Sequence, residues 1–229
     1  MTSPGSTRSR QRVERITAAL WGKYGDETLE ARTRLRSDPL DSLVKTILSQ
    51  NTSDVNSDRA FARLKERFPT WPEALAADVG DVEEAIRIGG LANIKAPRIL
   101  ELLASIKAAH GALDLGALAD LRTDEAEAQL LHYHGVGRKT AACVLLFALQ
   151  RPAFPVDTHC LRIARRLRLV PPACSADRAH DVLDGVVPDE LKLRLHVSMV
   201  IHGRRRCRPT SPSCEGCPIR RWCAYPKVA

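Results

Sequence analysis

The stretch Tyr133-His134-Gly135-Val136-Gly137-Arg138-Lys139-Thr140 decides how this chain is interpreted. A Gly-x-Gly turn leads directly into an apolar run, Ala141 to Leu149, which predicts a tight turn and then a helix. Glycines allow another backbone to approach closely, and a helix N-terminus adds unpaired N–H donors and a positive dipole end. The stretch therefore predicts an anion site on the backbone of Gly135, Val136 and Gly137, with Lys139 beside it. The other interpretation is an ordinary turn between helices.

Two further motifs follow this turn. Asp157, in Val156-Asp157-Thr158-His159, precedes a helical pattern, so it is an N-cap, a catalytic carboxylate, or both. The C-terminal region contains four cysteines with x6, x2 and x5 spacing: Cys207, Cys214, Cys217 and Cys223. Four thiolates in so short a segment can wrap one metal centre, and both zinc and an iron–sulfur cluster satisfy that chemistry.

The three motifs, in this order, resemble the endonuclease III branch of the helix-hairpin-helix DNA glycosylases over residues 12–223. The resemblance implies that Lys139 is the catalytic nucleophile and Asp157 the catalytic carboxylate. It also implies that the four cysteines hold a 4Fe–4S cluster rather than zinc. The sequence departs from the family pattern at His134, where proline is common, and at Ala92, where tyrosine is common.

The resemblance also suggests DNA-binding residues outside the hairpin. Asn51 takes the place of a family glutamine that fills the vacated base stack, and Leu91 matches a wedge residue. The other interpretations are a polar helix end for Asn51 and a core leucine for Leu91. His159 and Arg208 are expected to contact phosphate, although an isolated histidine is more often structural.

Apolar residues recur with helical spacing almost throughout the chain, which predicts an all-α protein. Asp38 is expected to cap one helix, Asp81 with Glu84 to form a capping box, and Gly111 to end a helix. Ten helices are expected, near residues 12–24, 39–49, 54–68, 81–88, 94–109, 123–132, 138–149, 158–168, 176–186 and 190–203. Residues 1–10 are expected to be a disordered basic tail.

By resemblance, the chain forms two helical domains with a DNA-binding cleft between them. Residues 32–151 would form a six-helix domain that contains the helix-hairpin-helix, and residues 11–31 with 152–229 would form the iron–sulfur cluster domain. The cleft would place Lys139 opposite Asp157.

Composition narrows the cellular setting of this 229-residue chain. A net charge of +8 and a pI near 9.4 are typical of a protein with a polyanionic partner. No secretory signal and no membrane-length apolar run is visible, which favours the cytoplasm, at the nucleoid in a bacterium. The cysteines would then be reduced, and three of them, Cys143, Cys160 and Cys174, are expected to be buried fillers.

These observations together suggest a base excision repair enzyme with glycosylase and abasic-site lyase activity. Its partner would be duplex DNA with oxidised pyrimidines or abasic sites, bound by a monomer. One alternative is a mismatch or modified-cytosine glycosylase of the same fold. The alternative from another class is a lesion-binding module with little catalysis.

Overall fold

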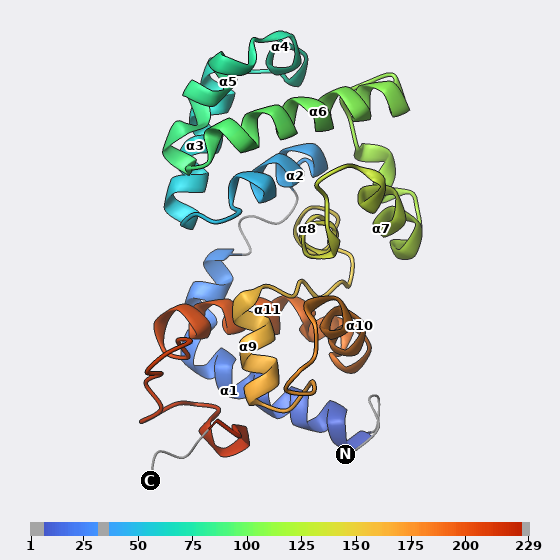
Figure 1. The fold of residues 1–229 in the computed structure, drawn as a ribbon. Helices are drawn as coiled ribbons and strands as arrows, with labels where there is room; N and C mark the ends of the chain where they lie inside the picture. Colours follow the sequence, from blue (N-terminus) through green and yellow to red (C-terminus); the bar gives the residue numbers. More distant parts are fainter. Residues whose placement is uncertain (1–6, 32–36, 226–229) are drawn as a thin grey trace. The chain divides into compact units, whose positions relative to one another are not determined.

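The computed structural model describes residues 7–31 and 37–225, with the backbone alone for residues 26–31. Regular structure in these ranges is helical, without a strand, which confirms the expected all-α fold (Figure 1). None of the helices in these ranges is both long and apolar enough to cross a membrane. The chain divides into a middle unit, Arg36–Gln150, and a discontinuous unit made of Met1–Leu35 and Arg151–Ala229.

The middle unit contains the hairpin. Its helices are α2 (Pro39–Leu48), α3 (Asp54–Arg67), α4 (Trp71–Ala76), α5 (Val79–Ile86), η2 (Arg87–Gly89), α6 (Ala92–His110), η3 (Gly116–Ala119), α7 (Thr123–His132), α8 (Arg138–Cys143) and the π-helical turn η4 (Val144–Ala148). The long helix α6 packs against α5, α4 and α2, and α8 packs against α2 and α7 (Figure 1). The unit therefore holds α8 against the helices that form its core.

Two apolar stripes with the predicted helical spacing, one on α2 and one on α6, form that core. Every member of both stripes is at most 2% exposed: Leu40, Leu43, Val44, Ile47, Leu48, Ile99, Leu102, Leu103 and Ile106. Asp38 caps α2 through hydrogen bonds from the N–H groups of Leu40 and Asp41, at 2.9 and 3.0 Å. Gly111 ends α6 with φ 72°, as expected.

The expected capping box at Asp81 and Glu84 is wrong. Helix α5 begins earlier, at Val79, and the carboxylate of Asp81 instead accepts a hydrogen bond from Arg67 at 2.8 Å. A capping box does occur at α4, a short helix that the apolar pattern did not indicate. There Thr70 and Glu73 exchange backbone-to-side-chain hydrogen bonds at 2.9 and 3.4 Å. With this helix, the described part of the middle unit has seven α-helices rather than the six expected.

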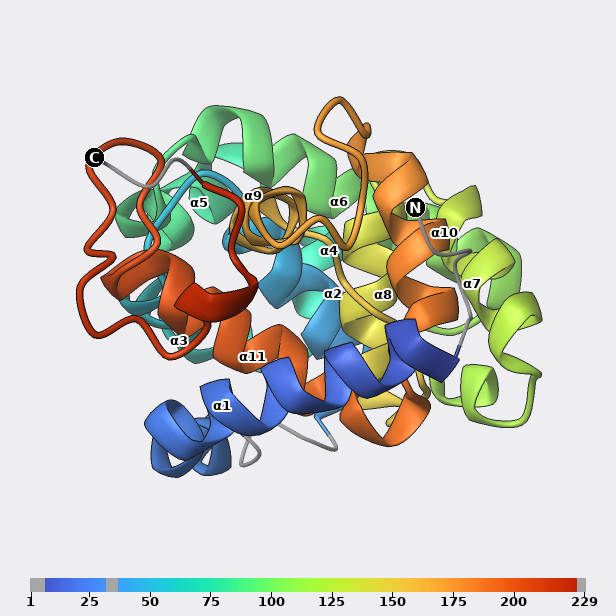
Figure 2. The same ribbon diagram turned by 90° about the horizontal axis from the view of Figure 1, so that it is seen from below.

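The discontinuous unit joins the two ends of the chain. Its helices are α1 (Thr7–Ala31), α9 (Thr158–Arg166), α10 (Ala176–Val186), α11 (Asp189–Arg205) and η5 (Arg220–Trp222). Helix α1 lies along α11, and both views show the two side by side (Figures 1 and 2). Three α1 side chains, Val13, Ile16 and Leu20, are fully buried in the core of this unit.

The prediction of a disordered tail to residue 10 is wrong for residues 7–10, because α1 begins at Thr7. Arg10 forms ion pairs with Glu14 one turn later, at 3.8 Å, and with Glu190 of α11, at 3.6 Å. The second of these pairs connects the first turn of α1 to α11. Residues 1–6 lie outside the described residues.

Candidate active site and cysteine pocket

The hairpin between α7 and α8 uses its two glycines for different reasons. Gly135 has φ 79°, and a Cβ there would lie 2.9 Å from Cδ of Arg98. Both the backbone conformation and this contact therefore disfavour any residue with a side chain. Gly137 is the N-cap of α8, and a Cβ there would meet nothing within 4 Å. The surface at Gly137 is therefore open to a large ligand, as an anion site at a helix N-terminus requires.

Val136 does not offer its amide as the sequence suggested. Its N–H donates to the carbonyl of Tyr133 at 3.1 Å, and its side chain is 6% exposed. The residue closes the turn and anchors it in the core. The first turn of α8 presents another set of backbone N–H groups, at the N-terminal end of a helix.

Lys139 lies half-buried in that first turn, next to the buried Thr140. The backbone N–H of Ala141 closes the helix onto the Gly137 carbonyl at 3.0 Å. The expected helix 138–149 is present, but it changes to a π-helical turn after Cys143. The buried Thr140 and the Ala141 hydrogen bond fix the backbone at Lys139, so its amine has a defined starting point beside the open turn.

Asp157 is the N-cap of α9, and its carboxylate accepts a hydrogen bond from the Cys160 N–H at 2.6 Å. Burial alone would raise the pKa of this carboxyl. The positive charge of His196 and the Cys160 hydrogen bond outweigh burial and hold the pKa of Asp157 below its usual value. Asp157 is therefore ionised at neutral pH, a fixed negative charge able to stabilise a nearby cation.

His159 lies two residues farther along, against Gly203 of α11. Its Nδ1 accepts a hydrogen bond from Nη2 of Arg162 at 3.0 Å, since a guanidinium only donates. Burial, together with the charges of Arg162 and Arg204, keeps the pKa of His159 below its ordinary value. The ring is therefore neutral at pH 7, with its proton on Nε2 as a donor suited to a phosphate oxygen.

Asn51 and Leu91 share an uncommon backbone conformation, with φ of 55° and 53°. Asn51 is exposed beyond the end of α2, so it is not part of that helix. Asparagine adopts the left-handed region more readily than glutamine does, which gives a physical reason for asparagine here. Leu91 is 45% exposed, so its interpretation as a core leucine is wrong.

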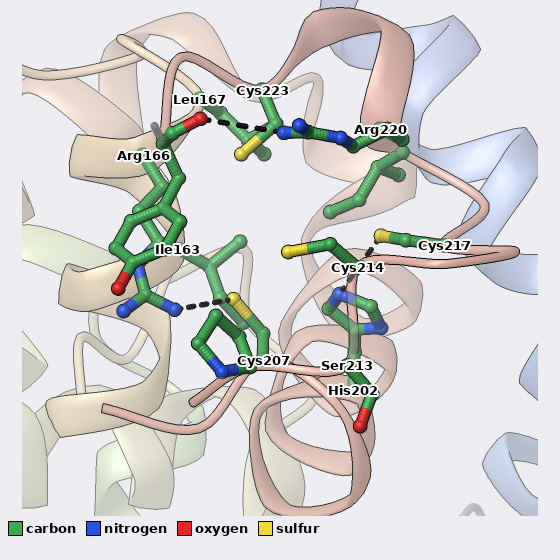
Figure 3. Close-up of a pocket in the computed structure, with 13 residues that line it drawn as sticks. Ile163, Arg166, Leu167, His202, Cys207, Ser213, Cys214, Cys217, Arg220 and Cys223 are labelled. Carbon is green, nitrogen blue, oxygen red and sulfur yellow. Dashed lines mark hydrogen bonds between the residues drawn. The ribbon is translucent and has the colours of Figure 1, made fainter. Parts of the chain in front are cut away.

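The four C-terminal cysteines surround one pocket of the discontinuous unit (Figure 3). None of the four forms a disulfide. The walls of the pocket are mostly apolar, with Ile163, Leu167 and Ile219 among the lining residues. No three His, Cys, Asp or Glu side chains among the described residues meet closely enough to hold a single metal ion.

Cationic and polar groups face the sulfur atoms of this pocket. Nη1 of Arg166 donates to Sγ of Cys207 at 3.1 Å, and Nε2 of His202 lies 3.7 Å from Sγ of Cys217 (Figure 3). Burial raises the pKa of the Cys217 thiol, and the charges of the other three cysteines raise it further. Four cysteines without a disulfide line one pocket, a set of sulfur ligands that fits a thiolate-bound group with more than one metal atom.

Arg208 is exposed next to the first of these cysteines, and its carbonyl accepts a hydrogen bond from Arg166 at 2.8 Å. That contact fixes the backbone of Arg208, and its side chain is exposed. The position is compatible with the expected phosphate contact.

Comparison with known proteins places the chain in a family. Residues 44–188 match the family described as HhH-GPD superfamily base excision DNA repair protein. Endonuclease III of Thermotoga maritima is 34% identical over 194 residues, 85% of this chain and 86% of that enzyme. The chain belongs to the HhH-GPD superfamily.

Other HhH-GPD relatives agree with this assignment. A protein of Arabidopsis thaliana that carries the name of a DNA glycosylase is 45% identical over 165 residues, which are 72% of this chain and 56% of that protein. A solved non-covalent endonuclease III–DNA complex superimposes with a TM-score of 0.77 at 26% identity, over 93% of this chain and 94% of that chain. The protein is thus a base excision repair DNA glycosylase of the endonuclease III type.

The sequence did not predict two arginines that support these candidate residues. Arg162 supports His159 and also donates to the carbonyls of Gly203 and Cys207, at 3.1 and 2.8 Å. Arg166 donates to Cys207. Arg162 and Arg166 lie four and eight residues after Thr158, which places them on one face of α9. The spacing does not indicate which groups that face contacts.

Proposed function

We propose that this glycosylase also cleaves abasic sites by β-elimination, and that its substrates are oxidised pyrimidines in duplex DNA. The observation that carries the proposal is the position of Lys139 in the first turn of α8, directly behind the open surface at Gly137. Phosphate held by the α8 N–H groups would bring a sugar within reach of an amine. The resemblance to the endonuclease III branch supports the oxidised-pyrimidine substrate.

The reaction would follow from an extruded nucleotide. The amine of Lys139 forms a bond to C1′ while the bond to the base breaks, and the base leaves with the electron pair and gains a proton. The attached nitrogen then loses one proton, and the C1′–O4′ bond breaks with its electron pair and a proton going to O4′, which gives a ring-opened, protonated Schiff base. This Schiff base makes the 2′ proton acidic, and loss of that proton expels the 3′ phosphate. Water then hydrolyses the Schiff base and frees the lysine. Asp157, ionised at neutral pH, would stabilise the positive charge that develops on the sugar.

The test of the nucleophile is covalent trapping on abasic-site DNA with borohydride, which reduces only a Schiff base. Lys139→Gln is expected to abolish trapping and strand cleavage while DNA binding is retained, because the α8 N–H groups and not the amine hold the phosphate. Lys107→Gln is the matched control, an exposed lysine in the same unit. Undiminished trapping by Lys139→Gln would assign the nucleophile to another amine.

The substrate class needs a separate measurement. Base release would be followed on duplexes that carry an oxidised pyrimidine, a mismatched thymine or a modified cytosine. Fastest release of the oxidised pyrimidine supports the proposal, and fastest release of either of the others would replace it. No release of any base, with binding intact, would reduce the protein to a lesion-binding module.

We also propose that Cys207, Cys214, Cys217 and Cys223 hold a 4Fe–4S cluster. Their arrangement around a pocket suits a group with several metal atoms, since a lone zinc ion needs four sulfurs about 2.3 Å from one point. When bound, the cluster would tie the C-terminal loop to α9 and α11. Cys217→Ser should lose iron and visible absorbance, whereas Cys143→Ser, outside the pocket, should keep both. A zinc-loaded, colourless wild type would overturn the assignment.

The remaining proposals concern setting and partner. The exposed Arg204, Arg205 and Arg208 support phosphate contacts around the cysteine loop. Duplex DNA with a damaged base or an abasic site would be bound by one copy of the chain. A location in the cytoplasm, at the nucleoid in a bacterium, stays a prediction.

A further inference from the structure

A lysine that cannot touch DNA holds two of the candidate DNA-binding segments. Lys95, in the first turn of α6, is 2% exposed. Its Nζ donates to the carbonyl of Leu48 at 2.7 Å and to the carbonyl of Gly89 at 2.9 Å. One ammonium group therefore joins the end of α2 to the end of η2.

This position is costly for a cation. Burial lowers the pKa of Lys95, and the first turn of a helix disfavours positive charge. The negative end of the α2 dipole, at the Leu48 carbonyl, offsets part of that cost. An apolar side chain would avoid burying a charge but would leave both carbonyls without this donor. The physical reason for a lysine here is therefore its hydrogen bonds to two separate segments.

Both joined segments carry a residue in the left-handed region. Asn51 follows Leu48 by three residues, and Leu91 follows Gly89 by two. The backbone N–H of Lys95 also donates to the Leu91 carbonyl, at 2.9 Å. Left-handed backbone in non-glycine residues persists only where surrounding contacts impose it, and Lys95 supplies those contacts next to both residues.

Arg98, three residues along α6, extends the connection to the hairpin. Its Nη1 donates to Oε1 of Gln50, the neighbour of Asn51, at 3.1 Å. Its stem lies against Gly135, where a Cβ would come within 2.9 Å of Cδ. The Asn51 segment and the Gly-x-Gly turn are thus held by one side chain.

We propose that Lys95 and Arg98, here called the α6 clamp, are positioning residues that fix Asn51, Leu91 and the Gly135 turn in a single arrangement for extruding a damaged nucleotide. The clamp acts through these segments and does not touch the reacting atoms. Phosphate binding at the turn, and insertion of Asn51 and Leu91 into the duplex, then occur together. This inference rests on the proposed function, because it assumes that these three segments contact DNA.

The clamp predicts a difference between two substrates. Extruding a paired base requires unstacking, which costs a few kcal/mol, whereas a preformed abasic site has no base to unstack. Lys95→Met and Arg98→Met should each slow single-turnover base release from a paired lesion about tenfold or more. Cleavage at a preformed abasic site should change by no more than about threefold, because the chemical groups are intact.

Matched controls separate positioning from stability. Lys192→Met removes another buried ammonium, 3% exposed, in the discontinuous unit. This ammonium donates to the Pro152 carbonyl at 3.1 Å and also pairs with Asp184 and Asp189, at 2.9 and 3.0 Å. Its two activities should change in parallel, if at all. Arg67→Met serves as the control for Arg98, because Arg67 pairs with Asp81 on the surface of the same unit. If Lys95→Met does not fold, the half-buried Arg98 decides the test.

Two more measurements test whether Arg98 acts through Gln50. Adding Gln50→Ala to Arg98→Met should slow base release no further, and the salt dependence of binding should match that of the wild type. A slope lower by about one would mean that Arg98 itself binds a phosphate, which would overturn its positioning role. Parallel loss of both activities in the clamp variants would overturn the clamp. A wild type inactive on both DNAs would instead overturn the proposed function.

Discussion

Asp157 caps α9, and the role in the reaction proposed for its charge can be separated from the cap by substitution. Its carboxylate caps α9 through the 2.6 Å hydrogen bond from Cys160, and asparagine caps a helix about as well as aspartate. Asp157→Asn should therefore retain most of the stability of the wild type. Asp157→Ala loses the cap, at a cost of about 1 kcal/mol, or roughly 2–4 °C in Tm for a chain of this size.

The two variants should differ in stability but not in activity. Without the negative charge, both should release a damaged base about 100-fold more slowly or worse, as when one preorganised electrostatic group is removed. The assays are thermal unfolding and single-turnover base release, each measured on wild type, Asp157→Asn and Asp157→Ala. An asparagine variant that keeps the wild-type rate would refute the catalytic role. Equal Tm loss in both variants would refute the assignment of the stability effect to the cap.

The same pair predicts a pH dependence. The pKa of Asp157 is held below its usual value, so ionisation favours the folded state. That contribution is fully present above the pKa of the unfolded chain and is lost as the pH falls through the folded pKa. The stability difference between wild type and Asp157→Asn should be constant above about pH 5 and disappear at lower pH. A difference that grows on acidification would contradict the direction of the shift.

Two further predictions concern backbone positions. Gly203→Ala should lower stability by about 1–3 kcal/mol and weaken lesion binding, because the new Cβ would lie 2.6 Å from Nδ1 of His159; unchanged unfolding and binding would show that the ring shifts freely. Asn51→Gly should keep or raise stability, since glycine accepts φ 55° without strain, and Asn51→Ala should lower it by about 1 kcal/mol. Both variants should lose preference for lesion DNA over undamaged duplex in binding at one salt concentration. Retained preference would remove Asn51 from the contact surface.

The sequence was sufficient for most of the helices. All ten predicted helices are present, because an apolar stripe such as Leu40 to Leu48 can be buried only if the segment is helical. Helix α4 was missed since six residues are too few to show a period, although Thr70 and Glu73 carry the signal of a capping box. Asp81 was misplaced because an aspartate three residues before a glutamate occurs on helix surfaces as readily as at helix starts.

The candidate site shows the same limit at the level of single residues. The motifs identified Lys139, Asp157 and the four cysteines, because short-range spacing sets which groups lie in one turn or loop. The local sequence pattern did not predict three features of the site. These are the hydrogen bond made by the Val136 amide, the exposure of Leu91 and the left-handed φ of Asn51. The Val136 hydrogen bond is to Tyr133, three residues back, whereas the other two depend on how segments distant in the chain pack.

The sequence by itself determined an all-α chain with a Gly-x-Gly hairpin, a capping carboxylate and a cysteine-rich loop, because helical period, cap preference and cysteine spacing are local properties. Only the tertiary structure decided what α6 joins. Lys95 reads in the sequence as one more lysine in a helix, yet folding buries it between carbonyls 47 and 6 residues away. A buried charge takes its role from the partners that compensate it, and those partners are brought together only by packing.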